Sequence, residues 1–431
     1  MPLTTLDDWI ARDAISFSLD APAEFDAAVD RLVAQLGESV ELLGIGEALH
    51  GGEEFLLLRN RLFARLAAAH GYSAIAIESS YTKGLAADDF VAGRSQATRE
   101  QLAESGFGHG FGKLTANLEL LEWMRDYNAD SAHATKLRFY GFDILTSPTG
   151  NASPRRPIEF AVDYMAAIDS ARGTEVRNII APLLGDDFSW ENPAGYADPS
   201  VRIGLSPNAA SLRLAVEDLI AELRRRSPEL IAALGADRYD EALQHAVNGR
   251  DQLTYHAAFA RGASLGELLG IRDALMADNL RYIARREQRH GKVLVFAHNA
   301  HLQRGLMSSW ESWRKAMNAE PFSWWPAGSH IASEFGPRYA VIGAAVGASE
   351  ANGISPAEPG SLEARLSVDS QPCHAVVTAP ARNLPAAKIA SLTPRSASTT
   401  NLSHIPLAPA SLTDFDALVV VNNVTLNRKS T

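Results

Sequence analysis

Short apolar runs along the chain alternate with longer segments whose apolar residues recur every three or four positions. The segment 53–70 is of the second kind and places Phe55, Leu58, Leu62 and Leu66 on one face, as in an amphipathic helix. The short runs are bounded by glycine or polar residues and predict strands, at 40–45, 73–77, 137–142, 292–297, 339–346 and 415–421. A strand, a helix and a second strand in succession form a unit whose two strands pair in parallel. The pattern therefore predicts an α/β fold with a mainly parallel sheet flanked by helices.

A long segment between the third and fourth predicted strands has a different pattern. Residues 146–157 are rich in Ser, Pro and Gly, as in a linker, and residues 158–289 have almost continuous helical spacing. We interpret this region as a helical insertion that caps the active-site cleft. The expected organisation is one domain with an N-terminal half of the core at 1–150, the insertion at 151–290 and the C-terminal half of the core at 291–431.

Composition narrows the class of protein. The chain has 431 residues, of which 46% are hydrophobic and 21% charged, and its formal net charge is −11. An acidic balance argues against general nucleic-acid binding, which needs a basic patch. Cys373 is the only cysteine, so an internal disulfide is not possible. No run approaches the roughly 18 apolar residues of a membrane span, and residues 1–21 lack the apolar core of a signal peptide. We expect a cytoplasmic protein with no membrane or nucleic-acid partner.

Acidic residues and histidines follow four of the predicted strands. In open α/β sheets, ligands bind at the carboxyl ends of the strands, and the side chains placed there are Glu47, His50, Glu78, Asp143, His298 and His301. A histidine oriented by a carboxylate can take a proton from water near neutral pH. His50 and Glu47 form the strongest pair, because glycines flank them at a strand-to-helix turn. The pattern favours general acid–base chemistry in one crevice.

Each of the other candidates also has a structural interpretation when it is taken alone. Glu78 could be a solvated or capping residue, Asp143 could cap a turn, and Arg59 could lie on a solvated helix face. His301 could be a surface imidazole, and so could His109 in the glycine-rich loop 106–112. For contact with a substrate we add His109, Asp143, Trp123 and Trp324, the last from an aromatic-rich segment able to line a pocket.

Three motifs resemble functional signatures but lack the context that those signatures need. Residues 262–266 match the Gly-x-Ser-x-Gly nucleophile elbow, yet Ser264 follows an apparent helix instead of a strand. Gly44 and Gly46 lack the third glycine of a dinucleotide loop, and Glu47 would oppose a pyrophosphate. The glycines of 106–112 follow no strand and lack the Lys-Ser/Thr end of a P-loop. We therefore predict that Ser264 is not a nucleophile.

Several segments together resemble the erythromycin esterase family. They are Gly-Glu-Ala-Leu-His-Gly at 46–51 with the following Glu54, Phe55 and Arg59, and the segments 76–78, 117–125, 272–280 and 296–301. The resemblance runs from about residue 25 to residue 425. It implies hydrolysis of the macrolactone ring of erythromycin-type antibiotics, without a serine nucleophile and without a cofactor.

The resemblance also implies roles for individual residues. His50 would be the general base for water, and Glu47 would orient it. Arg59, Glu78, His298 and His301 match the other polar residues of the family's site, where Arg59 or a protonated His298 or His301 would stabilise the oxyanion. Leu49 and Gly52 depart from the family, because many members have threonine and a polar residue there. This departure bears on the identity of the substrate more than on the chemistry.

Three alternatives stay open at this point. The substrate could be another ester or lactone. The protein could be a metal-dependent hydrolase, because His50, His298, His301, Glu47 and Glu78 are enough ligands for a metal ion. It could also be a non-catalytic protein that binds a small molecule in the same cleft.

Overall fold

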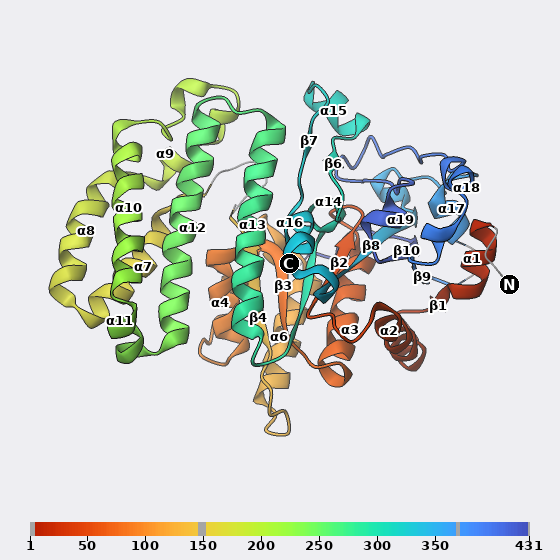
Figure 1. Cartoon of the computed structure of the whole chain (residues 1–431), viewed down its shortest axis with the longest axis horizontal. Coiled ribbons are helices and arrows are strands. Elements are labelled where there is room, and N and C mark those ends of the chain that lie inside the picture. The colour runs from red at the N-terminus through yellow and green to blue at the C-terminus, as the bar shows by residue number, and fades with distance from the viewer. Residues whose placement is uncertain (1–4, 145–151, 368–370, 430–431) are drawn as a thin grey trace.

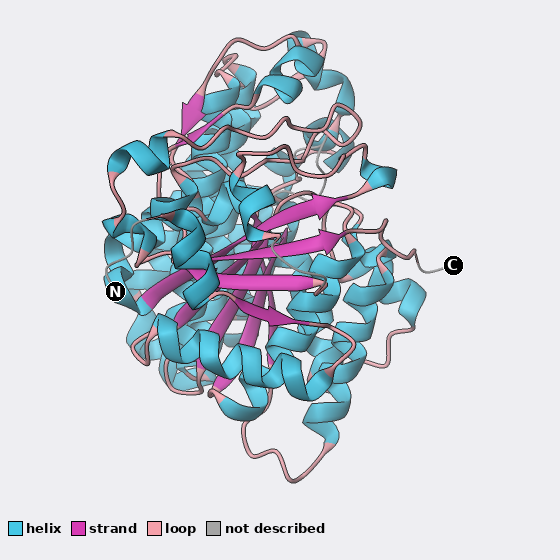
Figure 2. Cartoon of the chain, turned by 90° about the vertical axis from the view of Figure 1, so that its right-hand side faces the viewer, coloured by secondary structure: helices cyan, strands magenta, loops and turns pink. Residues whose placement is uncertain are grey.

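A computed structural model describes residues 5–144, 152–367 and 371–429. The centre of the molecule is an eight-stranded sheet with the strand order β1-β9-β10-β8-β2-β5-β3-β4 (Figures 1 and 2). Neighbouring strands from β10 to β4 pair in parallel, and β9 pairs antiparallel with β1 and β10. The strands of the sheet are β1 (Ile15–Phe17), β2 (Leu42–Glu47), β3 (Tyr72–Ser80), β4 (Arg138–Asp143), β5 (Lys292–His298), β8 (Tyr339–Ala348), β9 (Cys373–Val377) and β10 (Ala417–Asn423).

Helices cover both faces of this sheet, which is why the central strands are apolar almost throughout. Alternate residues of β5 enter different cores: Leu294 and Phe296 pack on one face, and Val293 and Val295 on the other. The first face is covered mainly by α2 (Pro22–Leu36), α3 (Glu53–Ala69) and α6 (Thr115–Ala129). The second is covered by α1 (Leu6–Asp13), α13 (Leu265–Glu287) and α16 (Ala327–Phe335).

The remaining helices connect the strands or form a separate group between β4 and β5. The connecting helices are α4 (Tyr81–Val91), α5 (Arg99–Ser105), α14 (Asn299–Leu302), α15 (Glu311–Met317), α17 (Leu362–Leu366), α18 (Ala386–Ala390) and α19 (Ser411–Asp414). A small hairpin is made by β6 (Met307–Ser308) and β7 (Ser323–Trp324). The separate group comprises α7 (Arg155–Ile168), α8 (Ser170–Leu184), α9 (Asp187–Glu191), α10 (Pro207–Arg225), α11 (Ser227–Leu234) and α12 (Ala236–Ala260).

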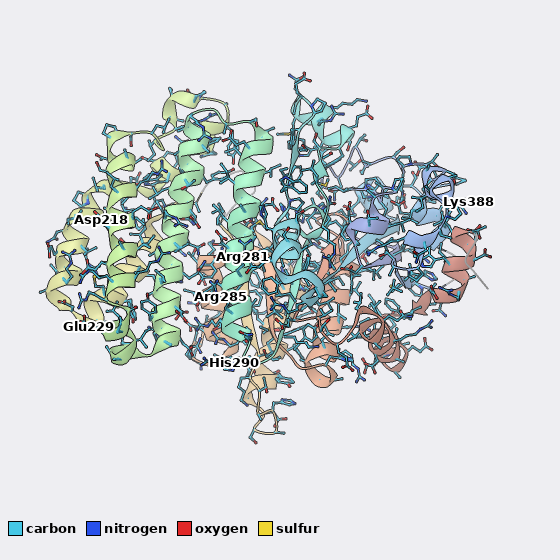
Figure 3. All side chains as sticks on the ribbon, viewed as in Figure 1. Asp218, Glu229, Arg281, Arg285, His290 and Lys388 are labelled. Carbon is cyan, nitrogen blue, oxygen red and sulfur yellow. The ribbon has the colours of Figure 1, made fainter. Side chains whose placement is uncertain are left out.

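This separate group confirms the helical insertion that the sequence predicts. Helices α7, α8, α10 and α12 bury a hydrophobic core of their own, with Ile158, Met165 and Leu212 among its residues. They lie beside the β4 end of the sheet (Figure 1), and charged side chains such as Asp218 and Glu229 stand on their outer side (Figure 3). The last helix of the segment, α13, instead packs on the sheet itself. The division at residues 150 and 290 remains a proposal, and most of the expected linker 146–157 lies outside the described residues.

All six predicted strands occur in the parallel part of the sheet, and two strands of its antiparallel edge were missed. β1 has only three residues, and β9 lies in a segment that we did not interpret as a strand. The polar segment 83–104 is mainly helical and contains most of α4 and the start of α5 through Glu104. Within the described part of the chain, no helix combines the length and the apolar character that crossing a bilayer requires.

Candidate active site

The strand order brings the predicted strand-end residues to one edge of the sheet. β2, β5, β3 and β4 are neighbours, and the register places Glu47 of β2 opposite His298 of β5. The pairing of β3 with β4 is irregular between Ile77 and Ser80, the kind of bulge that redirects a side chain beside a site. Glu78 lies in this irregular stretch. The acidic residues and imidazoles therefore converge, as the sequence predicts.

Two glycines let the first of these strands end beside the site. A Cβ atom at Gly46 would lie 2.0 Å from Oδ1 of Asn299, whose side-chain amide is fixed because it donates to the carbonyl of Ala344 and accepts from its N–H. Gly51 has φ +101°, a conformation that glycine adopts without steric cost. The turn that carries His50 therefore depends on glycine on both sides.

Glu47 and His50 form a close pair with one imidazole nitrogen left over. Glu47 Oε1 lies 2.6 Å from His50 Nδ1, and Nε2 of His50 has no hydrogen-bond partner among the described residues. The His50 side chain is 38% exposed, against 6% for Glu47. Burial lowers the pKa of His50, but the charge and hydrogen bond of Glu47, with the charge of Glu78, outweigh it and raise the pKa to about 9. An oriented imidazole with an open nitrogen is the arrangement that a general base needs.

A distant segment of the chain fixes the backbone at His50. Ser403 Oγ accepts the His50 N–H at 2.9 Å, and Asn401 Nδ2 donates to the His50 carbonyl at 2.8 Å. Ser403 Oγ in turn donates to Asn401 Oδ1. These contacts hold both polar groups of the His50 peptide unit, so the imidazole is placed by its turn and not only by Glu47.

His298 uses both of its ring nitrogens within the protein. Its Nε2 donates to the carbonyl of Ser403 at 2.8 Å, and its Nδ1 accepts from the N–H of Ala300 at 3.2 Å. A ring that accepts at Nδ1 is neutral, and burial, together with the charge of His50, lowers the pKa of His298 to about 3. The structure therefore does not support a protonated His298 as the oxyanion donor. His298 links the His50 turn to β5 instead.

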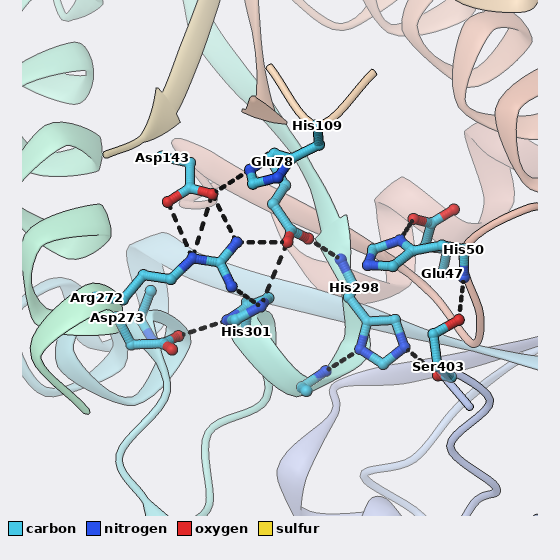
Figure 4. A network of polar contacts seen from close by, with 12 residues as sticks. Glu47, His50, Glu78, His109, Asp143, Arg272, Asp273, His298, His301 and Ser403 are labelled. Atoms are coloured by element: carbon cyan, nitrogen blue, oxygen red, sulfur yellow. Dashed lines mark hydrogen bonds and ion pairs between the residues drawn. The ribbon is translucent and has the colours of Figure 1, made fainter. Parts of the chain in front are cut away.

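Arg272 of α13 is the centre of the other half of the cluster (Figure 4). Its guanidinium donates to both oxygens of Asp143 and, from Nη2, to Glu78 Oε1 at 2.9 Å. Burial raises the pKa of the Asp143 carboxyl, but Arg272 and His109 outweigh it and hold that pKa well below its usual range. Burial likewise raises the pKa of Glu78, but the charges of His301, His50 and Arg272 outweigh it and hold that pKa well below its usual range. Both carboxylates are therefore ionised partners of a buried cation.

His301 is oriented by a second acidic residue of α13. Its Nδ1 lies 2.8 Å from Asp273 Oδ1, and its Nε2 lies 3.4 Å from Glu78 Oε1. Asp273 also accepts from the indole N–H of Trp324 at 3.1 Å and from the N–H of Ala327 at 2.8 Å. Burial lowers the pKa of His301, but Asp273 and Glu78 outweigh it and raise that pKa above its ordinary value. Trp324 thus contacts Asp273, and its expected contact with a substrate remains a prediction.

The other predicted site residues differ in how closely they join this cluster. His109 Nε2 lies 2.6 Å from Asp143 Oδ2, so it belongs to the Arg272 half. Arg59 lines a cavity with Glu47 and His50; its guanidinium donates to Asn60 Oδ1, and burial lowers its pKa to about 10. Trp123 packs edge-on against Phe63, with ring centroids 5.8 Å apart. No described hydrogen bond or ring contact joins Trp123 to the cluster.

Sequence reasoning missed Arg272 and Asp273 as site residues. Both lie in the segment 272–280 that carries part of the family resemblance, and that segment was the available signal. Their side chains are 12% and 0% exposed, whereas a charged pair on a helix is ordinarily solvated. Their place next to β3 and β4 follows from the packing of α13, which the sequence pattern does not give.

The cluster is organised around an internal cation. Arg272 holds Glu78 and Asp143, and Asp273 holds His301, so four of the acidic or imidazole groups already have partners. Among the described residues, no group of three or more His, Cys, Asp or Glu side chains has an arrangement suited to a metal ion. What the arrangement offers chemically is an oriented imidazole beside a set of fixed charges.

Comparison with known proteins places this chain in a family. A sequence profile of the family described as erythromycin esterase matches residues 67–424. Erythromycin esterase type II from Escherichia coli is 26% identical over 307 residues, which are 69% of this chain and 69% of that protein. Erythromycin esterase type I from Escherichia coli is 22% identical over 299 residues, 67% of this chain and 68% of that protein.

A solved structure shows the same fold. The erythromycin esterase EreC, as a mutant in its open conformation, superposes with a TM-score of 0.69 at 19% identity, covering 96% of this chain and 98% of that one. At this identity the superposition speaks for the fold alone, whereas the sequence profile covers most of the chain. The chain belongs to the erythromycin esterase family.

Proposed function

We propose that this protein hydrolyses a cyclic ester, with a macrolide as substrate, and that His50 activates the water. The observation that carries the proposal is the Glu47–His50 pair, whose open Nε2 stands at the carboxyl edge of the sheet. Membership in the family and the likeness to the two erythromycin esterases of Escherichia coli support the class of substrate.

The reaction can be written with the residues of this chain alone. His50 Nε2 takes a proton from water while the water oxygen bonds to the ester carbonyl carbon. The tetrahedral oxyanion then collapses, the bond to the ring oxygen breaks, and His50 returns the proton to the leaving alkoxide. Glu47 keeps Nδ1 protonated and stabilises the imidazolium formed between the two steps. The product is a hydroxy acid heavier than the lactone by one water.

His301 and Arg59 are the proposed donors to the oxyanion. His301 has a raised pKa, and its Nε2 lies 3.4 Å from Glu78 Oε1 and 3.4 Å from Arg272 Nη1. These contacts are longer than an ordinary hydrogen bond, so in the protonated form the Nε2–H would donate to an oxyanion that comes closer. Arg59 lines the cavity beside His50 and is buried, and a buried cation acts more strongly on a developing charge than a solvated one. Both come from elements that pack on the sheet, which keeps the donors fixed.

The test is mass spectrometry of a panel of macrolides with fourteen-, fifteen- and sixteen-membered rings after incubation with the pure protein. The expected result is a gain of one water mass in at least one member, without phosphate, nucleotide or glycosyl transfer. A dialysed, chelator-treated sample should act at the same rate as the untreated protein. A panel that stays unchanged rejects the macrolide, and activity that disappears with chelator and returns with zinc or manganese favours a metal-dependent hydrolase.

A further inference from the structure

A small cavity lies beside His50. It is bounded by His50, Glu78, Arg59, Phe111, Asn117 and Asn427, among others. The centre of a water molecule can move within about 20 Å³ of this cavity. About 10–15 Å³ by the same measure is enough for one water, provided that two to four polar partners are present. The cavity therefore has room for a water molecule but not for a larger nucleophile.

Two of the residues that line this cavity carry a side-chain amide oxygen without a partner. Asn117 is 2% exposed, and its Nδ2 donates to the carbonyl of Phe111 at 2.8 Å. This bond fixes which way the Asn117 amide faces, because only its NH₂ group, and not its oxygen, can bond to the carbonyl oxygen of Phe111. Oδ1 of Asn117 and Oδ1 of Asn427 are both buried without a hydrogen-bond partner among the described residues. A buried acceptor left unpaired costs free energy, so two in one cavity indicate a ligand that donates hydrogen bonds.

Asn427 belongs to a strap made by residues 424–429. Thr425 contacts Glu54, and Arg428 pairs with Glu53 at 2.6 Å, so the strap crosses the start of α3. The carbonyl of Arg428 also accepts from the N–H of Thr115 at the start of α6. Asn427, between these anchors, donates its own N–H to the carbonyl of Gly51. The strap thus fixes Asn427 next to the turn that carries His50.

We propose that this cavity is the site of the nucleophilic water, which is held by Asn117 and Asn427 and passed to His50. The proposal rests on the proposed hydrolysis. With His50 protonated, the imidazolium donates a hydrogen bond from Nε2 to the water oxygen, and the two O–H groups of the water donate to the two amide oxygens. With His50 neutral, one O–H group of the water donates to Nε2 and the other donates to an amide oxygen. The amide pair thus orients the water for loss of one proton, and the walls keep other nucleophiles out.

The first experiment locates the water molecule directly by crystallography and needs no substrate. A crystal structure of the wild-type protein at about 1.5 Å should show one ordered water within hydrogen-bond distance of both amide oxygens. The Asn427→Leu variant should lose this water without a change in the fold. Wild-type protein that shows no ordered water in the cavity overturns the proposal.

The second experiment identifies, from the reaction products, which nucleophile attacks the ester. In a buffer containing methanol, the wild-type protein should release the hydroxy acid with almost no methyl ester. Asn117→Ala and Asn427→Ala enlarge the cavity, so the ratio of methyl ester to acid should rise by at least about tenfold, the discrimination that one extra carbon allows. A change that merely weakens the fold would lower the rate without shifting this ratio.

Asn422 offers a matched control, because its Oδ1 is also buried without a described partner and it does not line the cavity. Asn422→Ala should leave both the rate and the product ratio as in the wild type. An unchanged ratio in both cavity variants overturns the proposal even if hydrolysis proceeds. A wild-type protein that hydrolyses no ester rejects the proposed function and this role of the water together, whereas an empty cavity with hydrolysis intact rejects the water site alone.

Discussion

The site contains two histidines with carboxylate partners, and their surroundings differ. In the His50 arm (Glu47, His50 and Ser403), the imidazole is 38% exposed and has one open nitrogen. In the His301 arm (Glu78, Arg272, Asp273 and His301), the imidazole is 7% exposed and both nitrogens face acidic groups. The same pair of residue types thus gives a group that can exchange a proton with a reactant and a group that is held in a fixed charge network. The open nitrogen, more than the pKa, distinguishes His50 from His301.

We expect the largest loss of kcat when His50, the histidine with the open nitrogen, is replaced. His50→Asn should lower kcat by at least about 10²–10⁴-fold, because the base is lost while a side chain of similar shape remains. Steady-state kinetics with an unchanged circular dichroism spectrum would show this. His133→Asn, at a histidine bound to the Tyr127 carbonyl outside the site, should have no effect. Near-normal turnover in His50→Asn would assign the chemistry to the other arm.

In the His301 arm, Arg272→Lys should cost about 10²-fold in kcat. A single ammonium cannot reproduce the fork that holds Asp143 and Glu78 together, and a displacement of about 1 Å is enough for such a loss. Arg281→Lys on the same helix is the control, since Arg281 pairs with Asp278 and Glu334 outside the cluster. If both variants behave alike, the network around Arg272 is not part of the catalytic geometry.

The sequence predicts the site residues that lie at strand ends, but not those that helix or loop packing brings into the site. Glu47, His50, Glu78, Asp143 and His298 lie at strand ends, and a parallel sheet brings such ends together whatever the rest of the chain does. Arg272 and Asp273 lie on a helix, and their inward direction depends on how α13 packs on the sheet. Ser403 acts mainly through its position in a loop without regular pattern. Residues placed by the end of a strand could therefore be predicted from the sequence. Residues placed by the packing of a helix or an irregular loop could not.

The fold shows the same division. The parallel strands are buried on both faces and therefore form apolar runs, such as Val293 and Leu294 in β5, that are recognisable in the sequence. β1 and β9 pair antiparallel at the edge, and β1 is too short to give a pattern. In the same way, the apolar face of α6 predicts a helix but does not tell which way Trp123 points. It packs on Phe63, not on the cluster.

A histidine with no carboxylate partner provides the contrast to both arms. His245 is 1% exposed, stacks on Phe160, and has neither ring nitrogen paired among the described residues. Burial lowers its pKa to about 3, so the unfolded chain binds the proton that the folded protein does not. Stability is then lost as the pH falls below about 6.5.

His245→Phe should remove this loss. Relative to the wild type, the variant should gain about 2 kcal/mol of unfolding free energy between pH 7 and pH 5, from 1.36 kcal/mol per pH unit. Urea denaturation at the two pH values measures the difference. A gain of the same size at both pH values would show that packing, and not protonation, is responsible.

The smallest expected effect is at Ser264. Its hydroxyl accepts from the N–H of Glu267 and caps the start of α13, and it follows a helix, not a strand. Ser264→Ala should keep kcat within about twofold and cost about 1 kcal/mol of stability at most, the typical worth of such a cap. Stoichiometric labelling of Ser264 by a fluorophosphonate would contradict the water mechanism.

The most direct test of the central claim, that His50 is the base and Glu47 sets its proton affinity, is the pH dependence of kcat/KM in the wild type and in Glu47→Gln. The base must be neutral to act, so wild-type kcat/KM should rise with pH up to the pKa of about 9 that Glu47 and Glu78 impose on His50 against its burial. Removing the Glu47 charge lowers that pKa, and the rising limb of the variant should move to lower pH with a smaller plateau. A rising limb at the same pH in both proteins, or a wild-type kcat/KM that falls between pH 7 and 9, would contradict the account.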